Sequence, residues 1–180
     1  MRPGTWVLVA GLAACDTPST PCTRGTVVLA QPGAWQRADT EADPFADHRP
    51  DEVVCPAYAL TVEGPALEVD TGACRYATLV QPMPQALPAG TEVTARVAHL
   101  DLVAPERAEA HVALAVAGAV GWSTLVPIPS APAVLEVRFS LPEAVPAGAP
   151  LAFHVHNHGA NRWLIFDVVA EDVCRSESTP

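Results

Sequence analysis

Short runs of alternating apolar and polar residues, separated by proline and glycine, dominate this chain from residue 25 onward. In residues 133–141 every second side chain is apolar, while Glu136, Arg138 and Ser140 occupy positions between them. Successive side chains of a β-strand point to opposite faces, so this pattern predicts a strand with one buried face. The same reasoning predicts strands over residues 26–31, 53–62, 66–70, 76–80, 92–102, 110–120, 133–141, 151–156 and 163–170.

Eight or nine short strands without an amphipathic helix of useful length favour an all-β fold, an antiparallel β-sandwich. Residues 106–116 contain good helix formers, but the alternation of Val112, Leu114 and Val116 with small residues favours a strand there. A chain of 180 residues suffices for one domain of ordinary size. We assign residues 25–174 to this domain and residues 175–180 to a disordered tail.

Two turn segments repeat each other: Pro84–Gly90 reads PQALPAG and Pro142–Gly148 reads PEAVPAG. Each is followed by a predicted strand. Proline and glycine are both typical of turns, so we interpret the repeat as recurring turn chemistry rather than as a duplication.

The first fourteen residues have the character of an export signal, with Arg2 followed by an apolar stretch at residues 6–14. Nine apolar residues are too few to span a membrane, which takes about twenty. Leu12-Ala13-Ala14-Cys15 resembles the lipobox of bacterial lipoproteins, which are cut before the cysteine and lipidated on it. The resemblance implies a mature chain that begins at a lipidated Cys15, with residues 15–24 as a tether. It also implies an extracytoplasmic location, anchored to a bacterial membrane in the periplasm or at the cell surface. The alternative is an ordinary signal peptide whose Cys15 joins a disulfide.

Four cysteines remain if Cys15 is lipidated: Cys22, Cys55, Cys74 and Cys174. An even number in an oxidising compartment indicates two disulfides, for which three connectivities exist. We favour Cys55–Cys74, which closes a local loop, and Cys22–Cys174, which ties the two ends of the domain together. No two cysteines have the short spacing of zinc-binding cysteine pairs.

The charge of the chain excludes several functions. The formal net charge is −10, and such a surface repels phosphate backbones, so we expect no nucleic-acid partner. All ten basic residues are arginine, which excludes chemistry that needs a lysine amine.

Three alternating histidines, His154, His156 and His158, suggest a metal site. On a strand with Leu151, Phe153 and Val155 facing the core, His154 and His156 project together from the other face, about 6.6 Å apart. Two such imidazoles can share one ion, and a turn at Asn157 decides where His158 lies. A further ligand can come from His111, His99 or a carboxylate, and copper or zinc suits imidazole ligands. The alternative is a partly exposed sheet face whose histidines bond one another or water.

The same region also suggests glycan binding. Trp163 with Asn157, Asn161 and Arg162 combines an aromatic ring with amides and a guanidinium, the groups that stack on a sugar ring and bond its hydroxyls. Residues 161–169 resemble the closing strand of galactose-binding-like jelly rolls, which include many carbohydrate-binding modules and adhesion domains. The resemblance implies a sandwich of the jelly-roll type and a glycan ligand. The alternative reading makes Trp163 an ordinary core aromatic, and Trp35 and Trp122 allow both readings too.

An acidic stretch precedes the second predicted strand, with Asp39, Glu41, Asp43, Asp47, Asp51 and Glu52. The alternation of the first three can hold a structural calcium ion, as carbohydrate modules of this kind often do. The stretch lacks the glycine and the glutamate of an EF-hand loop, so we favour a solvated acidic loop.

Enzyme signatures are absent from the sequence. Gly121-Trp122-Ser123-Thr124-Leu125 begins like a nucleophile elbow, but Leu125 stands where the second glycine belongs. We therefore expect a binding protein rather than an enzyme. A glycan or another cell-envelope component is the first expected ligand, a transition metal the second, and a structural or protein-interaction role the third.

Overall fold

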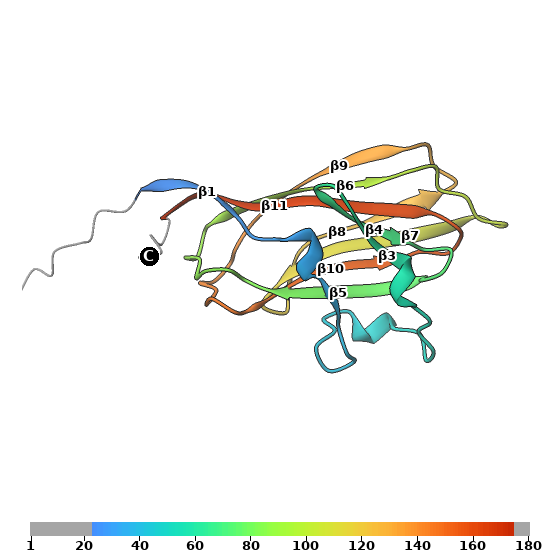
Figure 1. The fold of residues 1–180 in the computed structure, drawn as a ribbon, viewed down its shortest axis with the longest axis horizontal. Coiled ribbons are helices and arrows are strands. Elements are labelled where there is room, and N and C mark those ends of the chain that lie inside the picture. The colour runs from blue at the N-terminus through green and yellow to red at the C-terminus, as the bar shows by residue number, and fades with distance from the viewer. Residues whose placement is uncertain (1–22, 175–180) are drawn as a thin grey trace, which may run out of the picture.

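The computed structural model of the protein describes residues 23–174, which form two antiparallel β-sheets packed face to face (Figure 1). Sheet A contains β1 (Arg24–Val28), β3 (Leu60–Glu63), β4 (Ala66–Asp70), β6 (Glu92–His99), β9 (Ala133–Ser140) and β11 (Arg162–Cys174). Sheet B contains β2 (Gln36–Arg37), β5 (Tyr76–Pro82), β7 (Ala108–Val116), β8 (Ala119–Ile128) and β10 (Pro150–His156). Three short 3-10 helices are η1 (Pro32–Ala34), η2 (Ala46–His48) and η3 (Ala57–Ala59). The predicted all-β antiparallel sandwich is confirmed.

The strand order brings together segments that are distant in the sequence. Sheet A runs β3-β4-β11-β6-β9, with β1 also paired to β11, and sheet B runs β2-β5-β10-β7-β8. Among the described strands, only β3–β4 and β7–β8 pair with their neighbours in sequence. No helix within residues 23–174 has the length and hydropathy needed to cross a membrane.

The core lies between the sheets, and β10 shows how the sequence builds it. Leu151, Phe153 and Val155 are completely buried in the core, as their alternation predicts. The side chains between them project from the opposite side of sheet B, which we call its outer face. Ala152, His154 and His156 therefore share the outer face with residues of β5 and β7.

Two of the predicted strands differ from the observed ones. The strand expected over residues 110–120 is divided by a turn at Ala117 and Gly118, whose φ angles are 51° and 83°. Two positive φ values match the turn of a tight hairpin, but alanine is not a typical residue for it, so the turn and the following β8 were not predicted. The expected strand over residues 53–62 is wrong in its first part, because Pro56 and η3 interrupt the extended chain before β3.

The two repeated turn segments lie against each other. Leu87 and Val145 form an antiparallel bridge in which each backbone N–H donates to the other's carbonyl at 2.8 Å. One segment links β5 to β6 and the other links β9 to β10, so both cross between the two sheets. The repeated sequence therefore forms a matched pair of crossings that closes one end of the sandwich.

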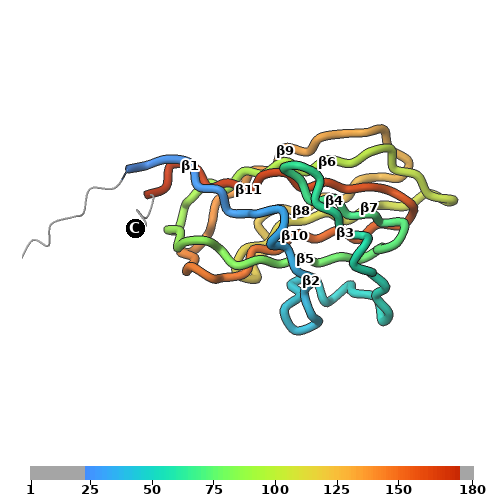
Figure 2. Tube along the Cα trace, viewed as in Figure 1, coloured from blue at the N-terminus to red at the C-terminus, as the bar shows by residue number. Residues whose placement is uncertain are grey.

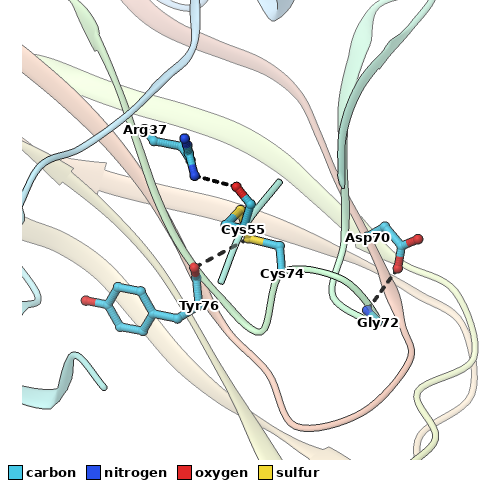
Figure 3. The surroundings of a disulfide bond; sticks show 6 residues. All are labelled: Arg37, Cys55, Asp70, Gly72, Cys74 and Tyr76. Carbon is cyan, nitrogen blue, oxygen red and sulfur yellow. Dashed lines mark hydrogen bonds between the residues drawn. A yellow bond between two sulfur atoms is a disulfide. The ribbon is translucent and has the colours of Figure 1, made fainter. Parts of the chain in front are cut away.

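The disulfide Cys55–Cys74 is confirmed (Figure 3). It joins the segment before η3 to the turn before β5, and the guanidinium of Arg37 donates to the carbonyl oxygen of Cys55 beside it. Cys174 is also a disulfide cysteine, and Arg24 pairs with it across β1 and β11. The expected partner Cys22 lies outside the described residues, as do the lipobox with Cys15 and residues 175–180.

Candidate metal centre

The acidic loop, residues 39–52, leaves the sandwich after β2, and the chain then returns to the sandwich at β3 (Figure 2). Its Phe45 is buried against three alanines of the outer face of sheet B, Ala113, Ala115 and Ala152. Small side chains on β7 and β10 thus leave room for an aromatic ring from the loop. This contact brings η2, which ends at His48, over the outer face.

Asp43 holds the loop in place. Its carboxylate accepts hydrogen bonds from the Tyr76 hydroxyl at 2.7 Å, from Arg49 Nη1 at 2.8 Å and from the Phe45 backbone N–H at 3.0 Å. Burial acts to raise the pKa of Asp43, but these hydrogen bonds outweigh it and lower the pKa below its usual value. Burial, together with the bond to Asp43, raises the pKa of Tyr76. The expectation of a solvated loop is wrong at Asp43, whose side chain is buried and structural.

Three histidines from distant parts of the chain converge at this loop. His48 Nε2 lies 3.0 Å from His154 Nε2 and 3.2 Å from His111 Nδ1. The three nitrogen atoms all lie within 4.8 Å of one another. Among the described residues, this is the one group of three or more histidine, cysteine or acidic side chains close enough to hold an ion. The carboxylates of the acidic loop that were considered for calcium do not form such a group.

The outer nitrogen of each ring has a hydrogen-bond partner of its own. His154 Nδ1 lies 2.9 Å from Thr78 Oγ1, His111 Nε2 lies 2.7 Å from Ser123 Oγ, and His48 Nδ1 lies 3.2 Å from a carboxylate oxygen of Asp47.

These partners decide which nitrogens carry protons. A carboxylate only accepts, so Asp47 fixes the proton of neutral His48 on Nδ1, and the two hydroxyls can accept from the other rings in the same way. With the proton on the outer nitrogen of all three rings, each inner nitrogen presents its lone pair to the same point, as a bound ion requires.

The surroundings favour the neutral form of His154 and His111. Burial, followed by the neighbouring imidazoles of His111 and His48, lowers the pKa of His154 to about 2. Burial and the nearby His48 also lower the pKa of His111. Since a metal ion binds neutral imidazole, His154 and His111 are ready to bind at neutral pH.

The spacing of the inner nitrogens suits a transition metal. Ligands at about 2.0–2.1 Å from an ion in tetrahedral geometry lie roughly 3.3–3.4 Å apart. The separations of 3.0 and 3.2 Å from His48 Nε2 need little adjustment, and the nitrogens of His111 and His154 lie within 4.8 Å of each other. A depression of about 510 Å³ lies beside the cluster, lined by His48, His111, Ser123, Thr124 and Leu125. The site therefore offers three imidazole ligands and room for a fourth ligand from solvent.

The structure brings together only some of the predicted metal ligands. His154 and His111 belong to the cluster, whereas His156 and His158 do not. His99 lies on sheet A, where it packs on Trp163 and bonds the Leu100 carbonyl, so it cannot reach the cluster.

His48 was missed by the sequence analysis. It lies on a short 3-10 turn, 106 residues from His154, where no periodic pattern marks it. The only sequence feature that drew attention to this region was the run of acidic residues around it.

The structure corrects the predicted glycan residues. Trp163, Asn157 and Asn161 are at most 2% exposed, so Trp163 offers no ring face to a sugar. The Trp163 indole N–H donates to Asn157 Oδ1 at 3.2 Å, and Asn157 Nδ2 donates to Thr71 Oγ1 at 2.9 Å. Arg162 is exposed but forms an ion pair with Glu68. The core-aromatic reading of Trp163 is therefore right, and Trp35 and Trp122 also pack against the core.

Comparison with known proteins gives the fold a wider context. No protein family matches the sequence, and no curated protein does. Among solved structures, the chain is similar to the carbohydrate-binding module TmCBM27, described for its specific mannan recognition, with a TM-score of 0.53, 9% identity and coverage of 86% of this chain and 99% of that one. It is also similar to the family 11 carbohydrate-binding module of Clostridium thermocellum, with a TM-score of 0.44, 11% identity and coverage of 86% and 99%. The likeness to TmCBM27 shows the fold, a sandwich of the jelly-roll type.

Proposed function

We propose that this protein is an extracytoplasmic, lipid-anchored protein that binds one copper or zinc ion through His48, His111 and His154. The observation that carries the proposal is the convergence of three inner nitrogens whose outer nitrogens all have partners. A metal-ligating histidine almost always bonds through its second nitrogen in this way, which fixes the ring and its tautomer. Both copper and zinc accept imidazole ligands.

The charge of the protein supports a cation as the ligand. A metal ion binds the neutral forms of imidazoles, so the ion keeps its charge in the site, and Asp47 lies behind His48 with a compensating negative charge. The net charge of −10 also attracts cations towards the surface as a whole.

Metal analysis of the untagged chain tests this proposal. Metal-free protein is titrated with Cu²⁺ or Zn²⁺, and bound metal is measured by elemental mass spectrometry after removal of free ion. We expect tight uptake at the cluster, lost in a His48→Gln/His111→Gln variant. Glu136→Gln is the control, because it changes an exposed side chain on β9 of the other sheet and removes no histidine. Tight uptake that survives in the first variant would exclude the three-histidine centre.

The anchoring part of the proposal rests on the lipobox-like sequence that ends at Cys15. Labelled fatty acid supplied to a bacterial host that expresses the chain should be incorporated into the wild-type protein and not into a Cys15→Ser variant. Equal labelling of both would exclude lipidation at this cysteine.

Glycan binding is a second candidate. TmCBM27 is described as a mannan-recognising carbohydrate-binding module, and the resemblance of residues 161–169 points the same way. The side chain that favours it here is Tyr58, whose ring is 77% exposed and can stack on a sugar. A glycan array that shows binding by the wild type and none by Tyr58→Ala would support this function, and an array without binding would exclude it for the glycans present.

A further inference from the structure

His156 and His158 form a second histidine pair next to the three-histidine cluster. His156 is half-buried on the outer face of sheet B, where it pairs in register with His111 of β7 and Tyr76 of β5. His158 is exposed just beyond the end of β10. Their ring centres are 4.9 Å apart. Two imidazoles that bind one ion at about 2.0–2.1 Å have ring centres roughly 5 Å apart, so this separation suits a shared ion.

The backbone around the pair, where the sequence predicted a turn, is held in place by hydrogen bonds. Asn157, between the two histidines, is completely buried, and its backbone N–H donates to the Arg75 carbonyl at 2.8 Å. Its side chain bonds both Thr71 and Trp163. Gly159 has a φ of 135°, and a β-carbon there would overlap the Val103 carbonyl oxygen. The residues first assigned to sugar binding thus fix the direction in which His158 leaves the strand.

A cavity gives an ion access to the pair. His156 and His158 both line a cavity of about 480 Å³, together with Tyr76, Arg75 and Glu52. This cavity is separate from the depression beside His111 and Ser123, whose lining includes neither histidine of the pair. Glu52 supplies a carboxylate to the same cavity, and the remaining positions are open to water.

His48, a member of the cluster, stacks beside His156 of the pair. Its ring lies parallel to that of His156, with an interplanar angle of 5° and ring centres 5.7 Å apart. Both His48 nitrogens already have partners, Asp47 on one side and the cluster on the other. The pair therefore cannot borrow His48 as a third ligand, and an ion held by the pair has two protein imidazoles where the cluster has three.

From this geometry we infer that His156 and His158 hold a second copper or zinc ion, more weakly and nearer to solvent than the ion of the cluster. The inference extends the proposed function but does not need it, because the two sites use different ligands. His156 lies in register with His111 and parallel to His48, so the second ion is placed close to the first and can exchange with it.

Titration of three forms of the full chain tests the inference. The wild type, His156→Gln/His158→Gln and His48→Gln/His111→Gln are each made metal-free and titrated with Cu²⁺, followed by calorimetry and by electron paramagnetic resonance. We expect two ions per wild-type chain, the second bound at least tenfold more weakly. The first variant should lose only the weaker ion and the second variant only the tighter one, so each serves as the control for the other.

The other possible outcomes show which of the two proposed sites is wrong. A single wild-type ion that is lost only on replacing His48 and His111 would overturn the second site and leave the proposed function standing. A single ion lost only on replacing His156 and His158 would overturn the proposed function instead. No bound ion in the wild type overturns both, and two ions that both disappear in either variant would show one joint site in place of two.

Discussion

The neutral histidine buried in the cluster should make the metal-free protein sensitive to mild acid. His154 is completely buried, and its pKa is lowered from 6.5 to about 2. In the unfolded chain the same side chain is protonated below about pH 6.5, whereas in the native state it stays neutral. A histidine whose pKa is depressed on folding gives a stability that is present above pH 6.5 and is lost as the pH falls towards the native pKa.

The magnitude follows from the size of the shift. Each pH unit in this window corresponds to about 1.4 kcal/mol for one proton, so His154 alone should lower the free energy of unfolding by about 2.7 kcal/mol between pH 7.5 and 4.5. That is a large share of the roughly 5–15 kcal/mol that stabilises a typical domain. Other histidines with lowered pKa values, His111 and His156, add to the slope of the wild type.

Urea denaturation of the metal-free protein at pH 7.5, 6.5, 5.5 and 4.5 measures the effect, with the buried Trp163 as a fluorescent reporter. His154→Gln lacks this contribution. Between pH 7.5 and 4.5, its free energy of unfolding should therefore fall by about 2.7 kcal/mol less than that of the wild type. His158→Gln, at an exposed position, is the control and should keep most of the wild-type dependence. Equal pH dependence in the wild type and His154→Gln would refute the reasoning.

Three further predictions concern the scaffold of the site. A Cys55→Ser/Cys74→Ser variant should lose about 3 kcal/mol of unfolding free energy in urea, because the bond closes a loop with a sequence separation of 19; an unchanged midpoint would contradict this. Gly121→Ala adds a β-carbon that would overlap the ring of the β9 phenylalanine, so it should cost about 1–3 kcal/mol in the same assay, while Gly33→Ala, with nothing within 4 Å, should be nearly neutral. Asp43→Asn weakens the anchor of the loop that carries His48 and should lower the affinity for Cu²⁺ or Zn²⁺ about tenfold in competition with a chelator. Unchanged affinity would show that the loop needs no anchor.

Local patterns predicted most of the strands because a strand with one buried face alternates apolar and polar residues within its own sequence. The alternation in residues 151–156 placed Phe153 in the core and His154 on the opposite face, and both placements are confirmed. The disulfide Cys55–Cys74 followed from counting cysteines and favouring the local pair. Two strands escaped prediction because one has only two residues and the other follows a turn that contains Ala117 at a positive φ.

The site was harder to predict because its parts meet only in three dimensions. His154 and His111 were found because they lie on neighbouring strands, but His48 comes from a loop whose path depends on the burial of Phe45. Trp163 was assigned to a glycan site because an aromatic residue among amides looks the same in sequence whether it faces solvent or the core. Its complete burial, with an asparagine that satisfies its N–H, decides between the two.

The position of β11 in sheet A governs when this protein can fold. The last strand of the described chain lies between β4 and β6 and also pairs with β1, so three strands from earlier in the sequence depend on it for a partner (Figure 1). Contacts between segments so distant in sequence form slowly, because a long loop must close before they contribute. A chain that ends before Arg162 should therefore lack the centre of sheet A and remain open. Under the proposed lipid-anchored location, a chain that has to be exported would stay unfolded during its synthesis until the whole domain is available.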